Sequence, residues 1–310
     1  VIFENSFVRV PKQGTRPSTK KNQTFINMEN FKQGFDWDIK QTPIYDAQGN
    51  VINNYKQITR DDDNSTIAVM KKSYVPMTTA EFTDTVERIS KQVGADVAGY
   101  EDWNLGNNMG SRKHIITAQL RLTNDVQIAG SRMDGFMTIG CGMDGSKSFF
   151  IAHSQEFLRC TNQFSRLVDK FTSRLTKNNM LRVEDIVNNI SLYTEYEKTL
   201  YNNMEKMLKV KIDEKLLQDC VARLVKLSDE ERLDRSLIST QKLNKIDDIM
   251  ASMRTEMADV GYNALGLMNG GTHHSTHVMD SRSQDYFGNL HGAKGEFNKT
   301  IYNFCCELIN

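Results

Sequence analysis

Three glycines and a lysine between residues 138 and 153, in the stretch TIGCGMDGSKSFFIAH, come close to two nucleotide-binding motifs. A phosphate-binding loop places its lysine directly after the last glycine and starts a helix there, whereas Ser146 separates Lys147 from that glycine. The dinucleotide fingerprint also needs a helix after its glycines, but residues 148–152 are aromatic and β-branched, as in a strand. A β-hairpin with Asp144-Gly145 at its turn explains the pattern more simply. We therefore expect no nucleotide cofactor.

The stretch GGTHHSTH brings three histidines together, His273, His274 and His277. On a helix, His273 and His277 would share a face and could bind zinc. Two glycines precede them, however, and no glutamate stands where a metalloprotease needs its base. These histidines are weak metal candidates. We expect no metal and interpret them as polar loop residues that cap a helix or contact a partner chain.

Adjacent carboxylates could hold magnesium, as they do in nucleases. Two such groups are the pair Glu101-Asp102 and the run Asp61-Asp62-Asp63. The run is typical of an acidic turn, whose side chains would alternate in direction if extended. No G-x-S-x-G nucleophile motif occurs in the sequence. We predict a protein without enzymatic activity and keep a magnesium-dependent nucleic-acid-processing enzyme as the third alternative.

Basic residues interleaved with the expected strands and helices are the strongest remaining signal. A nucleic-acid backbone requires cations spread along a groove, and aromatic rings can stack on its bases. The ten candidate nucleic-acid-binding residues are Lys71, Lys72, Arg112, Lys113, Arg121, Arg132, Lys147, Arg159, Arg166 and Lys170, and the four stacking candidates are Tyr74, Tyr100, Trp103 and Phe136. A solvated charged face is the competing explanation of the same pattern.

The 310 residues carry no net charge, with 39 lysines and arginines against 39 acids, but the charge is unevenly distributed. Residues 106–177 contain ten basic and five acidic side chains, and residues 178–310 contain sixteen and twenty. Such asymmetry is typical of a polyanion-binding half. No apolar run is long enough to span a bilayer. The five scattered cysteines show no zinc-pair spacing and fit a reducing cytoplasm.

Periodicity and turn signals predict an α+β fold in three parts. Residues 1–30 are basic and contain proline, as in an extended arm that contacts other subunits. Residues 31–177 should form an antiparallel sheet of hairpins. In this part a helix begins near Thr78 and ends at Gly94, a meander follows over residues 115–152, and a long helix over residues 154–177 backs the sheet. Residues 178–310 should form a helical subdomain with an irregular loop at 261–292 rich in glycine and histidine.

Three separated segments together resemble the phage/plasmid-like proteins grouped as domain of unknown function 932. They are IAVMKKSYVPMTTAEFTDTVERI, MDGSKSFFIAHSQEFLRCTNQF and LMNGGTHHSTHVMDSR, and they cover roughly residues 65–305. The matching positions include Asp144, Gly145, Ser146 and Asn162 in the second segment, and Asn269, Thr272 and Arg282 in the third. Arg159 and Cys160 are adjacent here, whereas the family separates them. The resemblance implies a phage or plasmid origin, without an agreed activity.

The layout of hairpins, meander and helix is also similar to that of single-strand annealing proteins, a likeness of fold alone. Together these observations predict a phage or plasmid DNA-binding protein that anneals or recombines single-stranded DNA as a homo-oligomer. The main alternative is a structural or interaction protein of the phage particle. In that case the arm and the glycine- and histidine-rich segment would make the contacts between subunits.

Overall fold

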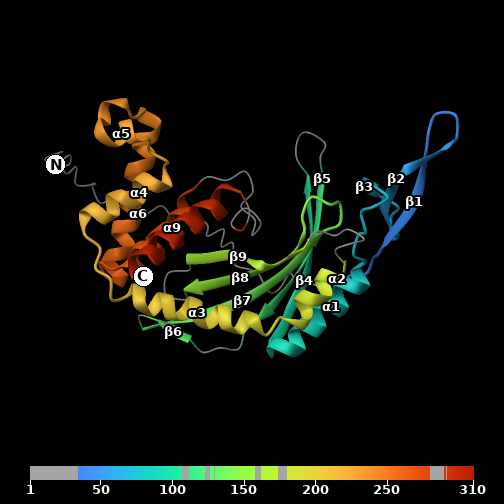
Figure 1. Cartoon of the computed structure of the whole chain (residues 1–310), viewed down its shortest axis with the longest axis horizontal. Helices are drawn as coiled ribbons and strands as arrows, with labels where there is room; N and C mark the ends of the chain where they lie inside the picture. Colours follow the sequence, from blue (N-terminus) through green and yellow to red (C-terminus); the bar gives the residue numbers. More distant parts are fainter. Residues whose placement is uncertain are drawn as a thin grey trace, which may run out of the picture.

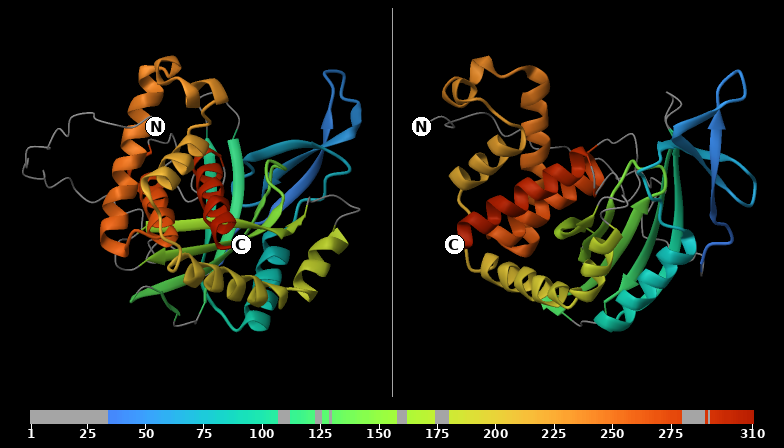
Figure 2. Two further views of the ribbon diagram at one scale, coloured as in Figure 1. Left: turned by 60° about the vertical axis from the view of Figure 1, so that its left-hand side comes forward. Right: turned by 45° about the vertical axis from the view of Figure 1, so that its right-hand side comes forward.

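The computed structural model describes residues 34–106, 112–122, 126–128, 130–157, 162–173, 180–279, 290 and 292–310. The fold is α+β, as expected, with antiparallel sheets and a helical C-terminal region. The predicted arm at residues 1–30 lies outside the described residues. A three-stranded sheet and the helical region stand at opposite ends of a larger sheet (Figures 1 and 2).

The three-stranded sheet consists of β1 (Ile39–Tyr45), β2 (Val51–Arg60) and β3 (Thr66–Lys71), paired antiparallel in that order. The carboxylate of Asp46 accepts hydrogen bonds from the backbone N–H groups of Gln48 and Asn50, and these bonds close the β1–β2 turn. Gly49 has a φ of 84°, which glycine adopts readily. This hairpin agrees with the antiparallel sheet of hairpins that was expected for residues 31–177.

The larger sheet is an antiparallel meander, which confirms that part of the prediction. Its strands follow the order β4-β5-β7-β8-β9, with β6 paired to β7. The strands are β4 (Asp96–Gly106), β5 (Arg112–Arg121), β6 (Val126–Ile128), β7 (Ser131–Gly142), β8 (Phe149–Phe157) and β9 (Asn162–Ser173).

The glycine-rich stretch is a hairpin, because strand β8 follows it where a nucleotide-binding loop needs a helix. Gly145 occupies the turn with a φ of 72°. At Gly140 a Cβ atom would lie 2.5 Å from Cζ of Phe150 on the neighbouring strand, so only glycine fits there. The glycines thus serve the turn and the close packing of two strands.

Helix α1 (Thr79–Val93) shows how local sequence fixes an element. Thr78 and Glu81 form a reciprocal capping box, and Gly94 ends the helix in the left-handed conformation. Phe82, Val86 and Ile89 recur at helical spacing and are fully buried. All these features were expected from the sequence.

The predicted helix over residues 154–177 is wrong. That segment contains the end of β8 and the strand β9, which pair antiparallel. Phe150 pairs with Thr172 but Ala152 pairs with Leu167, so three residues of β8 lie opposite six residues of β9. This bulge interrupts the two-residue alternation of a strand. The resulting apolar spacing of three and four imitates a helix in the sequence.

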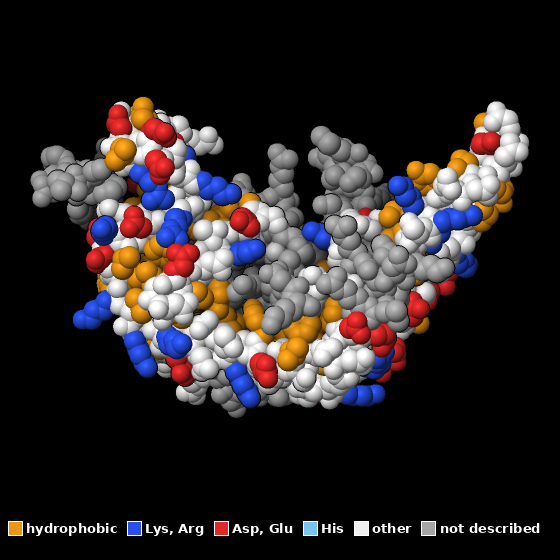
Figure 3. Space-filling view, in the orientation of Figure 1, with side chains coloured by type: hydrophobic (Ala, Val, Ile, Leu, Met, Phe, Trp, Pro, Cys, Tyr) orange, Lys and Arg blue, Asp and Glu red, His pale blue; other side chains and the backbone are white. Residues whose placement is uncertain are grey.

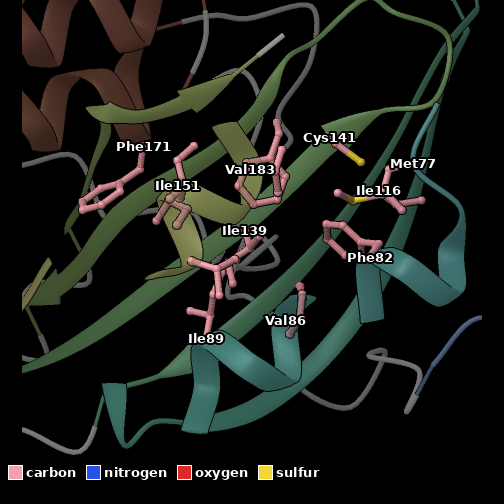
Figure 4. Packing of buried hydrophobic residues seen from close by; sticks show 14 of the residues in the cluster. Met77, Phe82, Val86, Ile89, Ile116, Ile139, Cys141, Ile151, Phe171 and Val183 are labelled. Carbon is pink, nitrogen blue, oxygen red and sulfur yellow. The ribbon is translucent and has the colours of Figure 1, made fainter. Parts of the chain in front are cut away.

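One face of the larger sheet carries the core of this half of the molecule. Ile116, Ile139 and Ile151 from neighbouring strands meet α1 and Val183 of α2 (Met180–Asn188), as Figure 4 shows. Burying such a side chain contributes about 1.5–3 kcal/mol. The sheet is therefore backed by α1 and α2 instead of by the expected 154–177 helix.

The C-terminal region is helical, as predicted. It contains α3 (Leu192–Met207), α4 (Glu214–Leu224), α5 (Asp229–Leu233), the 3-10 helix η2 (Arg235–Leu237), α6 (Thr240–Val260), α7 (Ala264–His273), the π-helix η3 (His274–Val278) and α9 (Ala293–Ile309). Helices α7 and α9 contact strand β9, so this region continues from the edge of the sheet (Figure 1).

The predicted irregular loop at 261–292 is wrong over residues 264–278, which form α7 and η3. The glycines there permit close helix packing. A Cβ at Gly270 would lie 2.4 Å from Cα of Met253 in α6, and one at Gly271 would lie 2.1 Å from Cδ1 of Ile301 in α9. Glycine in a helix costs about 1 kcal/mol relative to alanine, and tertiary packing outweighs that cost here.

Candidate nucleic-acid interface

The turn between β7 and β8 joins three basic segments that are distant in sequence. Tyr74 Oη donates a hydrogen bond of 2.7 Å to the carbonyl of Gly142, which holds the turn against the chain that follows β3. Met143 N donates to the carbonyl of His114 at 2.8 Å, and this contact holds the turn against the start of β5. Lys71-Lys72, Lys147 and the backbone of Arg112-Lys113 therefore lie in adjoining segments.

The lysines of these segments differ in their exposure to solvent. Lys71 and Lys72 are exposed and Lys147 is half-buried. The turn is also packed tightly, because a Cβ at Gly145 would lie 2.5 Å from Cε of Met70. Space-filling atoms in Figure 3 show lysine and arginine side chains along the three-stranded sheet. The fold thus brings cations together without a salt bridge holding Lys71 or Lys72 in the described part of the chain.

An exposed tyrosine adjoins these lysines. Tyr55 on β2 lies directly opposite Lys71 on β3, and Val69 follows on the same face two pairs further along, opposite Gln57. Tyr55 is 39% exposed and Val69 is 52% exposed. An aromatic ring on an open sheet face can stack on a base while a neighbouring ammonium group meets the phosphate. We call Tyr55, Val69 and Lys71, together with Lys72 in the turn that follows β3, the Tyr55 face.

Arg60 fixes the three-stranded sheet to the larger sheet. Its Nη1 lies 2.8 Å from Oδ2 of Asp102 on β4, and its guanidinium covers the ring of Trp37 at 4.0 Å. The other oxygen of Asp102 lies 2.7 Å from Nε2 of His114 on β5. This network joins β2, β4 and β5 and sets the direction in which the Tyr55 face points.

The environment of Asp102 favours its charged form. Burial by itself would raise the pKa of this carboxyl, but the contacts with His114 and Arg60 hold the pKa below the ordinary value of 3.8. The hydrogen bond to Asp62 and, after it, the contact with Asp102 raise the pKa of Arg60. Asp102 and Arg60 are therefore both charged near neutral pH.

Three of the four predicted stacking residues are in the core. Tyr74, Tyr100 and Phe136 are only 7%, 4% and 8% exposed, so their rings cannot meet a base in this conformation. The side chain of Trp103 lies outside the described residues. Sequence reasoning missed Tyr55, although β2 gave a signal. The stretch VINNYKQ lacks an apolar alternation, which indicates a strand exposed on both faces.

Two of the remaining predicted cations lie away from this site. Arg121 is exposed at the far end of β5, roughly 30 Å from the start of that strand at 3.4 Å per residue. Arg132 begins β7 near the same far end. Arg166 and Lys170 fall in β9, with side chains outside the described part, and Arg159 lies outside it entirely. Arg121 and the backbone of Arg132 thus lie apart from the Tyr55 face.

The acidic candidates for a magnesium site are engaged within the protein. Asp102 contacts Arg60 and His114, as described above. Asp62 contacts Arg60 at 2.7 Å, and the hydrogen bond from that guanidinium lowers the pKa of Asp62 to about 2. Asp63 accepts a hydrogen bond from the backbone of Ser65. These contacts explain the acidic run as a turn that supports Arg60.

The three histidines have different surroundings. His273 Nδ1 lies 3.1 Å from the buried carboxylate of Glu256, and its ring packs against that of His277. His274 is buried, with Nδ1 at 3.3 Å from Oγ of Ser252, and burial lowers its pKa to about 4. Within the described ranges, no group of three or more histidine, cysteine or acidic side chains is placed to hold a metal.

Comparisons with protein-family models, curated proteins and solved structures return no match for this chain. Among the described helices, none combines the length and the apolar character needed to cross a membrane. The candidate site consequently rests on its own geometry.

Proposed function

We propose that the protein binds single-stranded DNA without sequence preference, as an annealing or recombination factor of a phage or plasmid that acts as an oligomer. The observation that carries this proposal is the pairing of Tyr55 with Lys71 on an open sheet face, next to Lys72 and the β7–β8 turn. To hold one nucleotide, an aromatic ring must stack on the base while a neighbouring cation contacts the phosphate. The resemblance to phage and plasmid proteins supports the origin.

The mechanism follows from the two kinds of side chain. Lysine ammonium groups release counterions from the phosphates and hold the backbone. The ring of Tyr55 holds a base by its flat face, which leaves the hydrogen-bonding edge of that base open to a complementary strand. This arrangement suits strand annealing better than cleavage, because the described acids nearby are committed to Arg60 and to turns.

Fluorescence anisotropy with a labelled 40-nucleotide single strand tests the proposal across a salt series. The logarithm of the affinity should fall linearly with that of the salt concentration, with a slope of about −0.7 per contacted phosphate. The double variant Lys71→Ala, Lys72→Ala should weaken binding to every sequence and flatten this slope. Tyr55→Ala should cost roughly 1–3 kcal/mol of binding without altering the slope.

A matched control removes two exposed lysines elsewhere. Lys206→Ala with Lys209→Ala changes the net charge equally, at the end of α3, and should leave both affinity and slope unchanged. If folded wild-type protein fails to bind the strand at low salt, DNA binding is excluded. The alternative, a structural or interaction protein of the phage particle, then takes its place. Metal-dependent cleavage of the strand would favour the nuclease instead.

A further inference from the structure

The segment between α4 and α6 is well formed but packs few of its side chains. Ser228 and Glu231 make a capping box at α5, and Asp234 caps η2. None of the residues of α5 or η2, all of them described, is buried. Leu233 is 79% exposed and Leu237 is 57% exposed. We call residues 228–237 the α5 end.

The β1–β2 hairpin, at the other end of the molecule, is also regular in structure but largely exposed. Strand β1 has no buried residue, and the first five residues of β2 are exposed. Tyr45 and Val51 lie opposite each other at 59% and 42% exposure, and Ile52 is 38% exposed. A two-stranded hairpin without a buried face is marginally stable by itself. We call Tyr45, Val51 and Ile52 the hairpin end.

The two ends carry opposite charge. The α5 end has four acids, Asp229, Glu230, Glu231 and Asp234, against Arg232 and Arg235. The hairpin, residues 39–60, has Lys40 and Lys56 against Asp46, while Arg60 is paired with Asp62 and Asp102. Complementary charge steers two surfaces together and disfavours pairing of either surface with itself. An acidic surface also repels nucleic-acid phosphates, which argues against a nucleic acid as the occupant of the α5 end.

Figures 1 and 2 place the two ends at opposite extremities of the molecule, so one chain cannot bring its own ends together in this arrangement. We propose that the α5 end of one copy docks on the hairpin end of the next copy. The contact buries Leu233 and Leu237 against Tyr45, Val51 and Ile52. Such a head-to-tail interface is heterologous, and it repeats to give a ring or a filament. It is independent of DNA binding.

Size-exclusion chromatography with light scattering tests this on the full chain without DNA. Leu233→Asp with Leu237→Asp blocks the α5 end, and Tyr45→Ser with Val51→Asp blocks the hairpin end. Each double variant should be monomeric, at 35.5 kDa, where the wild-type protein assembles. An equimolar mixture of the two variants retains one intact junction per pair. Its mass should therefore double, to about 71 kDa, and stop there.

Leu192→Asp is the matched control, because Leu192 is 44% exposed on α3 outside both ends, and it should assemble like wild type. A monomeric wild-type protein overturns the proposal, as does either blocked variant that assembles normally. A mixture of folded variants that stays monomeric overturns the head-to-tail geometry. Circular dichroism verifies folding. Where an aspartate variant unfolds, the corresponding serine variants take its place with the same expected masses.

Discussion

Arg60 and Asp102 form an ion pair of 2.8 Å that links strand β2 of the small sheet to strand β4 of the large one. Both side chains are only 17% exposed, so the pair is partly withdrawn from water. The direction of the Tyr55 face therefore depends on a contact between residues 42 positions apart in the sequence.

Asp102→Asn should destabilise the protein by about 1–3 kcal/mol at pH 7, because the guanidinium of Arg60 loses a charged acceptor. The pKa of Asp102 is lowered in the folded state, so its contribution is complete above pH 3.8 and is lost as the pH falls through the lower folded value. Urea unfolding at pH 7 and at pH 3 checks this, and the difference from wild type should shrink at pH 3. The exposed Asp84→Asn, a control, should change stability by less than about 0.5 kcal/mol. An equal loss at both pH values would contradict the role of the charge.

Burial of His153 should make the protein sensitive to mild acid. This ring is completely buried beside Tyr193, and burial lowers its pKa from 6.5 to about 3. Between these values the unfolded chain binds the proton and the folded chain does not, so stability rises with pH. The loss from pH 7 to pH 5 should be about 2 kcal/mol for this histidine. His153→Gln should flatten the dependence in urea unfolding at pH 5, 6 and 7, whereas the exposed His277→Gln should keep it. Parallel curves for wild type and His153→Gln would refute the assignment.

Gly270→Ala should destabilise the helical region although alanine is the better helix former. The added Cβ would lie 2.4 Å from Cα of Met253, and such overpacking costs typically about 1–3 kcal/mol. Calorimetry should show a lower Tm. Gly34→Ala meets no atom within 4 Å and should leave the Tm unchanged. A higher Tm for Gly270→Ala would show that α6 and α7 pack less closely than described.

Tyr74→Phe should lower stability by about 1–2 kcal/mol, because the carbonyl of Gly142 loses its buried hydrogen-bond donor. The β7–β8 turn should also exchange its amide hydrogens faster, as measured by mass spectrometry. Tyr45→Phe is the matched control, since Tyr45 is 59% exposed. Unchanged exchange at Met143 in Tyr74→Phe would exclude this bond as the anchor of the turn.

Local sequence determined the elements whose signals lie within a few residues. The capping box of Thr78 and Glu81, the apolar face of α1 and its stop at Gly94 depend on neighbours along one helix, and all were predictable. The hairpins at Asp46 and at Asp144-Gly145 were predictable too, because their turns need particular φ values and side-chain acceptors.

Only the tertiary structure decided which residues face solvent and which strands pair. Tyr74 and Tyr55 are the same residue type near the same strands, yet one ring is in the core and the other is open, because the β7–β8 turn covers only Tyr74. The bulge in β9 is likewise set by its pairing with β8 and gave a misleading helical period in the sequence. Burial and register depend on contacts between distant segments, so the pattern of one segment cannot fix them.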